Sequence, residues 1–268
     1  MNAPTTLPDI QAHRDARNVP IDAVGIRGVR YPVTVQSGDE CAATVASFTM
    51  TVGLPASDKG THMSRFVEAL ESLPQVLDPP GFRQLLCDVV RRLGARDGAI
   101  EMRFTWFARK AAPVSRAESL LDYEVTWRGT LKDGVCGFAV HVLVPATSLC
   151  PCSKEISEYG AHNQRSHIGI EVALARDMSL RELIAVADGA ASCQVYGLLK
   201  RADEKYVTEW AYDNPRFVED LVREVALALR RDPRVGRFVV EAENFESIHN
   251  HSAIARIESP PAAGRGAT

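Results

Sequence analysis

One order of predicted elements occurs twice in succession along the chain, and it limits the possible folds more than any other feature of the sequence. Segments rich in Val and Thr with partial alternation predict strands, and apolar residues at helical spacing predict helices. In the first half, strands are predicted at residues 27–36, 41–54, 99–108 and 119–131, and helices at about 63–73 and 81–93. In the second half, strands are predicted at residues 135–145, 166–174, 237–244 and 252–258, and helices at 179–191 and 215–231. Each half therefore has the order strand, strand, helix, helix, strand, strand.

The repeated order predicts an α+β fold built from two tandem modules. Hairpins followed by paired helices form an antiparallel sheet with both helices on one face. We divide the chain into an N-terminal segment (1–26), a first module (27–131), a second module (132–259) and a disordered tail (260–268) rich in Pro, Ala and Gly. A single α+β domain whose repetition is coincidental is the alternative.

Local signals support the predicted turns and helix starts. Ser-Gly-Asp at residues 37–39 predicts the turn between the first two strands. Ser179 is followed three residues later by Glu182, which is the pattern of a capping box. Pro215 suits the first turn of the last helix.

The composition excludes several classes of protein. The formal net charge of −3 argues against a general nucleic-acid binder, because such proteins are usually distinctly basic. No apolar run approaches the roughly 20 residues that a membrane-spanning helix needs, and residues 1–18 lack the apolar segment of a secretory signal. We therefore predict a cytoplasmic protein without nucleic-acid or membrane partners. In a reducing cytosol its six cysteines are expected to be free thiols or metal ligands.

The segment Cys150-Pro151-Cys152 lies in a polar loop between two predicted strands, where a thiol can face a cleft. Thiolate is a strong ligand for zinc-like ions and a strong nucleophile. His162 follows twelve residues after Cys150, so a flexible connection would allow both side chains to bind one metal ion. The spacing leaves open the alternative of structural or merely exposed thiols.

Two glutamates each have an ordinary and a functional interpretation. Glu204 lies in the charged run 200–205, which is typical of a solvated turn but supplies a carboxylate ligand if the fold brings it to the cysteine loop. Glu219 lies among apolar residues at helical spacing, and burying a carboxylate is costly without a partner. A guanine edge is one such partner, because its N1–H and amino group offer two parallel donors. A surface glutamate on the rim of an amphipathic helix is the alternative.

His249 and His251 precede the last predicted strand. Imidazoles suit proton transfer and metal binding because their pKa lies near neutrality. Side chains at i and i+2 share one face of an extended segment, but Asn250 between them favours a turn. A structural role or a phosphate contact is the alternative for His251. Nearby basic residues are candidates for phosphate contacts or for ordinary solvation: Lys154, Arg165, Lys200 and Arg201.

Five strings of the sequence together resemble one known family. Three are Leu-Cys-Pro-Cys-Ser-Lys-Glu-Ile-Ser at 149–157, Gly-Ala-His-Asn-Gln-Arg-Ser-His at 160–167 and Glu-Ser-Ile-His-Asn-His at 246–251. The others are Pro-Asp-Ile-Gln at 8–11 and Lys-Gly-Thr-His-Met-Ser-Arg at 59–65. The combination of Cys-Pro-Cys with His-Asn-His is specific. The chain resembles the type IB GTP cyclohydrolases over nearly its whole length, from about Pro8 to Glu258.

The resemblance implies a fold, an assembly and a reaction. It implies the tunnelling fold (T-fold) with two modules per chain, and a homotetramer with active sites at subunit interfaces. The implied reaction is that of GTP cyclohydrolase I (EC 3.5.4.16), which converts GTP and water to 7,8-dihydroneopterin triphosphate and formate. This is the first step towards tetrahydrofolate and some modified tRNA bases. The implied cofactor is a divalent metal, Mn²⁺ or Zn²⁺, with Fe²⁺ as a third option.

By position, the resemblance also implies roles for five residues. Cys150, His162 and Glu204 correspond to metal ligands, and Cys150 is also important for catalysis. His249 corresponds to the histidine that transfers protons, and Glu219 to the carboxylate that holds guanine. The implied mechanism is attack of a metal-activated water on guanine C8.

Two other functions are open on the sequence. A related nitrile reductase of the same fold uses a cysteine adduct and NADPH, but His162 and His249 suit a metal site better. A metal buffer or thiol sensor that uses Cys150 and Cys152 would bind metal tightly without turning over GTP.

Overall fold

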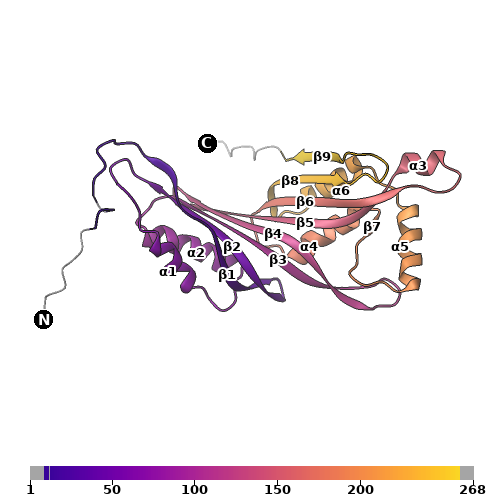
Figure 1. Cartoon of the computed structure of the whole chain (residues 1–268), viewed down its shortest axis with the longest axis horizontal. Coiled ribbons are helices and arrows are strands. Elements are labelled where there is room, and N and C mark those ends of the chain that lie inside the picture. The colour runs from indigo at the N-terminus through magenta and orange to yellow at the C-terminus, as the bar shows by residue number, and fades with distance from the viewer. Residues whose placement is uncertain (1–8, 12, 260–268) are drawn as a thin grey trace. The chain divides into compact units, whose positions relative to one another are not determined.

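The computed structural model describes residues 9–11 and 13–259 (Figure 1). The first half contains β1 (Ile21–Ser37), β2 (Glu40–Leu54), α1 (Ser64–Glu71), α2 (Pro79–Arg92), β3 (Gly98–Ala111) and β4 (Glu118–Lys132). The second half contains β5 (Val135–Leu149), α3 (Pro151–Ile156), β6 (Asn163–Leu174), α4 (Leu180–Ala190), β7 (Cys193–Gln194), α5 (Arg201–Asp213), α6 (Val218–Arg231), β8 (Val235–Asn244) and β9 (Ala253–Glu258). The predicted order of elements is confirmed, and α3, β7 and α5 are additions to it in the second half.

The strands form one sheet in the order β1-β2-β3-β4-β5-β6-β8-β9, and β7 pairs with β5. The registers that join β2 to β3, β5 to β6 and β7, β6 to β8, and β8 to β9 are antiparallel. Alternate residues of β5 from Phe138 to Ser148 are buried, so one face of this strand lies in the core. The predicted α+β class, with an antiparallel sheet and paired helices, is confirmed.

The chain packs into two compact units, and long strands contribute to both. Among the described residues, the first unit takes those up to 35 together with 45–103 and 127–138, and the second takes 36–44, 104–126 and those from 139 onwards. The division into modules between residues 131 and 132 stays a prediction. The predicted tail, 260–268, lies outside the described residues.

In the first unit, α1 and α2 contact each other, and three aromatic side chains form a cluster beside α2. The helix α2 begins at Asp78, whose carboxylate accepts the Gly81 N–H at 2.7 Å. Phe82 on α2 contacts Trp127 and Phe138, and the ring centroids of each pair lie 5.7 Å apart. These contacts between large buried rings hold α2 against the sheet.

In the second unit, α4 packs against α6, and α6 packs on β8 and β9 (Figure 1). The predicted capping box is confirmed, since Ser179 Oγ accepts the Glu182 N–H at 3.3 Å and the Glu182 carboxylate accepts the Ser179 N–H at 2.9 Å. The prediction that Pro215 lies in the first turn of α6 is wrong. The Asp220 carboxylate accepts the Phe217 N–H at 3.0 Å, and this cap starts the helix one residue after Phe217.

Several strands are longer than their sequence pattern predicts, β1 and β5 among them. β1 begins six residues before the predicted start at residue 27. β5 continues past Pro145, which pairs in register with His167, and it ends at Leu149. The polar loop predicted after residue 145 is therefore strand up to the residue before Cys150. The predicted turn at 37–39 is confirmed, and Gly38 has there the positive φ of 62° that such turns favour.

The longest described helices, α2 and α6, have 14 residues each. Within residues 9–11 and 13–259, no helix combines the length and the apolar character needed to cross a membrane. The cytoplasmic location stays a prediction.

Candidate functional site

Cys150 lies where β5 ends and α3 begins, and it is the N-cap residue of that short helix. Its Sγ accepts the Ser153 N–H at 3.5 Å, and its carbonyl accepts the Lys154 N–H at 3.2 Å. Pro151, which has no N–H to leave unpaired, occupies the first turn. Cys150 is half-buried, whereas Cys152 is exposed. The structure therefore fixes the position of the Cys150 thiol and leaves Cys152 facing solvent.

His162 lies against the Cys150 turn and is held through both polar groups of its backbone. Its carbonyl accepts the Cys150 N–H at 3.1 Å, and its own N–H donates to Ser153 Oγ at 3.2 Å. Its ring Nδ1 lies 3.0 Å from Gln164 Oε1 and 3.4 Å from Ser247 Oγ. The thiol and the imidazole that were predicted as metal ligands thus belong to two segments joined by direct hydrogen bonds.

Behind His162, four buried polar side chains form a continuous hydrogen-bonded chain. Gln164 Nε2 lies 2.8 Å from Ser148 Oγ, and Ser148 Oγ lies 2.9 Å from Ser166 Oγ. Ser166 Oγ lies 2.7 Å from Asn244 Oδ1. None of these four residues was singled out from the sequence. The signal available there was polar side chains at alternate positions of a strand, 164 and 166, which both point into the core.

Glu204 lies in the first turn of α5, so the interpretation of its charged run as a solvated turn is wrong. The helix is fixed there because buried Asp203 accepts the N–H groups of Val114, Ser115 and Lys200, each at 2.8 Å. Burial raises the pKa of Asp203, but hydrogen bonds from the Ser115 hydroxyl and from these backbone groups lower it well below its usual range.

One face of α5 packs beside the cysteine turn. Val207 and Ala211 belong to a small core cluster with Leu149 and Ala161. Glu204 precedes Val207 by three positions and Ala211 by seven, so the three residues share one helical face. The Glu204 side chain is exposed in the first turn of α5, at the end of the helix held by residues 114–115, whereas Tyr212 at the other end contacts Lys154 of α3.

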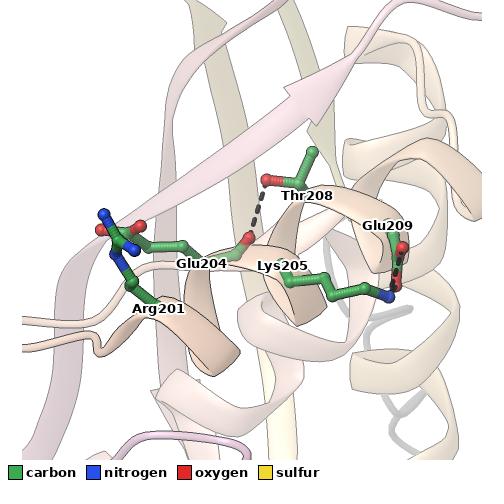
Figure 2. Close-up of a pocket in the computed structure, with 5 residues that line it drawn as sticks. All are labelled: Arg201, Glu204, Lys205, Thr208 and Glu209. Atoms are coloured by element: carbon green, nitrogen blue, oxygen red, sulfur yellow. Dashed lines mark hydrogen bonds and ion pairs between the residues drawn. The ribbon is translucent and has the colours of Figure 1, made fainter.

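Glu204 also lines an open depression of about 420 Å³ on α5, shown in Figure 2 with Arg201, Lys205, Thr208 and Glu209. Lys205 extends towards Glu209, and its Nζ lies 2.6 Å from Glu209 Oε1. The Thr208 hydroxyl donates to the backbone carbonyl of Glu204 at 2.7 Å. The lysine adjacent to Glu204 in sequence is thus directed away from the Glu204 carboxylate.

Residues 245–252 connect β8 to β9 and carry both predicted histidines. The rings of His249 and His251 stack, with centroids 5.0 Å apart and planes at 12°, and both side chains are exposed. The two side chains lie side by side because the loop bends there, and not because they occupy alternate positions of a strand. Ser247 of the same loop reaches Nδ1 of His162 at 3.4 Å, so the loop lies beside His162.

Glu219 lies in the first turn of α6 and is exposed. The interpretation of Glu219 as a buried carboxylate that needs a partner is wrong, and the alternative of a surface glutamate on the helix is confirmed. The buried face of the helix consists of Val218, Leu221, Val222, Val225, Ala226 and Leu229. The segment before the helix is attached to the site, because the Arg216 N–H donates to the Leu149 carbonyl at 3.0 Å. Glu219 is therefore accessible to a ligand. It follows by three residues Arg216, which is bonded to Leu149, the residue before Cys150.

These contacts bring together the segments that carry Cys150, His162, His249 and Glu219, whereas Glu204 lies at the far end of α5. Among the residues that the structure describes, no three or more His, Cys, Asp and Glu side chains are grouped so as to bind a metal ion. Cys150 and His162 lie in segments joined by a hydrogen bond, but within one chain the Glu204 carboxylate is not grouped with them as a third ligand. A thiolate and an imidazole are donors that zinc-like ions prefer, so this pair suits such an ion as two of its ligands.

The sequence profile of the family described as Type I GTP cyclohydrolase folE2 matches residues 7–255, a range that includes all five predicted site residues. The chain belongs to this family. GTP cyclohydrolase FolE2 of Neisseria meningitidis serogroup A (strain DSM 15465 / Z2491) is 54% identical over 255 residues, which cover 95% of this chain and 86% of that relative. GTP cyclohydrolase FolE2 of Paraburkholderia xenovorans (strain LB400) is 53% identical over 265 residues, which cover 98% of this chain and 99% of that relative.

Among solved structures, uricase from Arthrobacter globiformis is similar to this member of the folE2 family, with a TM-score of 0.51. The match covers 92% of this chain and 96% of the uricase chain at 7% sequence identity, so it concerns the fold alone. Uricase has the tunnelling fold, and the predicted T-fold is thereby confirmed.

Proposed function

We propose that this chain converts GTP and water to 7,8-dihydroneopterin triphosphate and formate, the first step of tetrahydrofolate biosynthesis. Relatives that are 53–54% identical are named GTP cyclohydrolase FolE2. The structural observation that carries the proposal is the pairing of Cys150 and His162, whose backbones share a hydrogen bond of 3.1 Å. Membership of the folE2 family disfavours the nitrile reductase and the metal buffer as alternatives.

Cys150 and His162 are the residues that we propose hold a divalent cation, which is Mn²⁺ or Zn²⁺ with Fe²⁺ as a third option. Sulfur and imidazole nitrogen suit these ions. Such an ion, when bound, lowers the pKa of a coordinated water towards neutrality. Glu204 is the proposed third ligand from the resemblance, and because one chain does not group it with Cys150 and His162, it would come from a neighbouring subunit.

His249 and Glu219 are proposed to act on the purine. An imidazole accepts and donates protons near neutral pH, and His249 is exposed in the loop that contacts His162 through Ser247. Its proposed role is to move protons to and from the nitrogens of the opening imidazole ring of guanine. The exposed Glu219 carboxylate would accept the N1–H and the amino group of guanine, and so orient C8 towards the site.

The outer surface of α5 supports assembly into the proposed homotetramer. Tyr206 and Trp210 stack with ring centroids 5.7 Å apart, and 49% of Trp210 is exposed. Tyr212 is 38% exposed and Phe217 is 40% exposed. Exposed aromatic side chains gathered in this way are typical of protein interfaces. Of the proposed metal ligands, one chain brings together only Cys150 and His162. In a homotetramer, a neighbouring subunit would supply the remaining metal ligand.

The proposed function is tested by incubating the metal-free full-length chain with GTP, and then repeating the incubation after adding Mn²⁺ or Zn²⁺. We expect stoichiometric formate release, and neopterin fluorescence after oxidation and dephosphorylation of the product, only in the metal-loaded samples. A protein that binds metal and GTP but releases no formate would contradict the proposed reaction.

A further inference from the structure

The buried polar chain behind His162 connects three adjacent strands of the second unit. Ser148 on β5 lies opposite Gln164 on β6, and Ser166 on β6 lies opposite Asn244 on β8. Ser148 and Ser166 are 0% exposed, Asn244 is 3% exposed and Gln164 is 7% exposed. Polar groups at this depth are costly unless each is hydrogen-bonded, so their arrangement is strongly constrained.

The assignment of oxygen and nitrogen in the Asn244 and Gln164 amides fixes the direction in which this chain donates. Asn244 Oδ1 can only accept, so the single hydroxyl proton of Ser166, 2.7 Å away, is directed to it. The 2.9 Å contact between the two serines is then a hydrogen bond only if the Ser148 hydroxyl donates to Ser166 Oγ. Ser148 Oγ in turn accepts from Gln164 Nε2 at 2.8 Å. The amide nitrogen of Gln164 is therefore committed to Ser148.

This direction determines which nitrogen of His162 carries the proton. With its nitrogen on Ser148, Gln164 presents Oε1 to His162 Nδ1 at 3.0 Å. An amide oxygen only accepts, so Nδ1 is protonated and the neutral ring keeps its lone pair on Nε2. Ser247 Oγ, at 3.4 Å from the same Nδ1, is the weaker contact.

We propose that Gln164 is a positioning residue, which holds His162 in the tautomer whose Nε2 binds the metal ion, and that Ser148, Ser166 and Asn244 hold Gln164 in the required orientation. The proposal rests on the proposed function, because it assigns a partner to His162, one of the proposed metal ligands. Histidines that bind metals commonly donate their second ring N–H to an acceptor of this kind, and the loss of that acceptor weakens metal binding.

The test compares Gln164→Leu with Gln164→Glu in the full-length chain. Leu removes the acceptor at similar size, whereas the carboxylate of Glu still accepts from Nδ1–H and can accept the Ser148 hydroxyl where the amide donor is lost. In a competition of the metal-free protein with a chromophoric chelator for Zn²⁺, we expect the Kd of Gln164→Leu to rise roughly 10- to 100-fold. We expect Gln164→Glu to bind Zn²⁺ close to the wild-type Kd. Unchanged binding by Gln164→Leu, or equal weakening in both variants, would overturn the proposal.

Thermal unfolding of the same metal-free variants separates positioning from general stability. If Gln164 has only a structural role, each variant should lose Zn²⁺ affinity in proportion to the fall in its unfolding temperature. If Gln164→Leu does not fold, Ser166→Ala carries the test, since it removes a link of the chain that lies away from the metal. We expect Ser166→Ala to weaken Zn²⁺ binding in the same direction as Gln164→Leu but by less, and an unchanged Kd would overturn the proposal.

Cys150→Ala distinguishes failure of this proposal from failure of the proposed function. If the wild-type chain binds no Zn²⁺, or Cys150→Ala binds it as tightly as the wild type, the metal site itself is wrong and both proposals fall. If Cys150→Ala loses Zn²⁺ while Gln164→Leu retains the wild-type Kd, the positioning role of Gln164 alone is overturned.

Discussion

The two halves of the chain use the same order of strands and helices but join them through very different connections. Residues 38–39 join β1 to β2, whereas residues 150–162 join β5 to β6 and include α3. Residues 72–78 join α1 to α2, whereas residues 191–217 join α4 to α6 and include β7 and α5. The predicted metal ligands all lie in these longer connections of the second half. A shared scaffold thus acquires its candidate chemistry through its loops.

The interiors of the two halves differ in a related way. In the first unit the core is organised by the contacts of Phe82 with Trp127 and Phe138, which are apolar packing. The second unit buries the hydrogen-bonded chain that runs from Gln164 to Asn244. Buried polar groups are costly unless they are hydrogen-bonded, and this chain ends at Gln164 Oε1, which lies 3.0 Å from His162 Nδ1.

The largest expected effect is on catalysis, and it should differ between Cys150 and Cys152, two cysteines of the same connection. We expect Cys150→Ala to reduce formate release from GTP to the background level, because it removes a proposed metal ligand that α3 holds in place. The matched control is Cys152→Ala, which changes an exposed thiol two residues away and should retain most of the activity. Normal turnover of GTP by Cys150→Ala would contradict the proposal that the connections of the second half carry the chemistry.

The next effect concerns substrate binding at α6. We expect Glu219→Gln to raise the KM for GTP roughly 10- to 100-fold, because a hydrogen bond to a charged group contributes about 1.5–3 kcal/mol. The metal content of the purified protein should stay unchanged. Glu224→Gln, which alters an exposed carboxylate of the same helix, is the control and should have the wild-type KM. Loss of metal in Glu219→Gln would show that its role has been misassigned.

A smaller effect tests how α5 is held. Hydrogen bonds keep the pKa of Asp203 well below its usual range in the folded protein, despite its burial. Its contribution to stability is therefore fully present above the unfolded pKa of about 3.9 and is lost as the pH falls through the lower folded value. We expect Asp203→Asn to lower the Tm at pH 7 and the difference from the wild type to shrink below about pH 4. A difference that stays constant down to pH 3 in urea unfolding would contradict this account.

The smallest effect tests whether the first half contributes only packing. Ile100 in β3 is 1% exposed, and Ile100→Val should lower the free energy of unfolding by about 0.5–1.5 kcal/mol. We expect the Zn²⁺ affinity and the KM for GTP of the folded variant to equal those of the wild type. Altered metal binding would show that the two halves do not divide packing and chemistry as proposed.

Much of the scaffold could be predicted from the sequence, because its strands and most of its helices have a clear apolar period or a local cap such as Ser179 with Glu182. The helix α5 could not be predicted in this way. Its buried residues are only Asp203 and Ala211, and its start depends on hydrogen bonds between Asp203 and residues 114–115, far away in the sequence.

The candidate site shows the same limit. Residue type and the resemblance pointed to Cys150 and His162, and the structure holds these two together. The partners of His162 could not be inferred, since the contact from Ser166 to Asn244 joins residues 78 positions apart. Buried polar pairs of this kind depend on strand register, which a single sequence does not fix.

The central claim is that the connections of the second half form a metal site on Cys150 and His162. X-ray absorption at the zinc K-edge of the Zn²⁺-loaded chain tests it most directly. The account predicts one sulfur neighbour at about 2.3 Å together with nitrogen or oxygen neighbours at about 2.0–2.2 Å, and loss of the sulfur signal in Cys150→Ala but not in Cys152→Ala. A zinc ion with no sulfur neighbour in the wild-type chain, or one that keeps its sulfur in Cys150→Ala, would contradict the account.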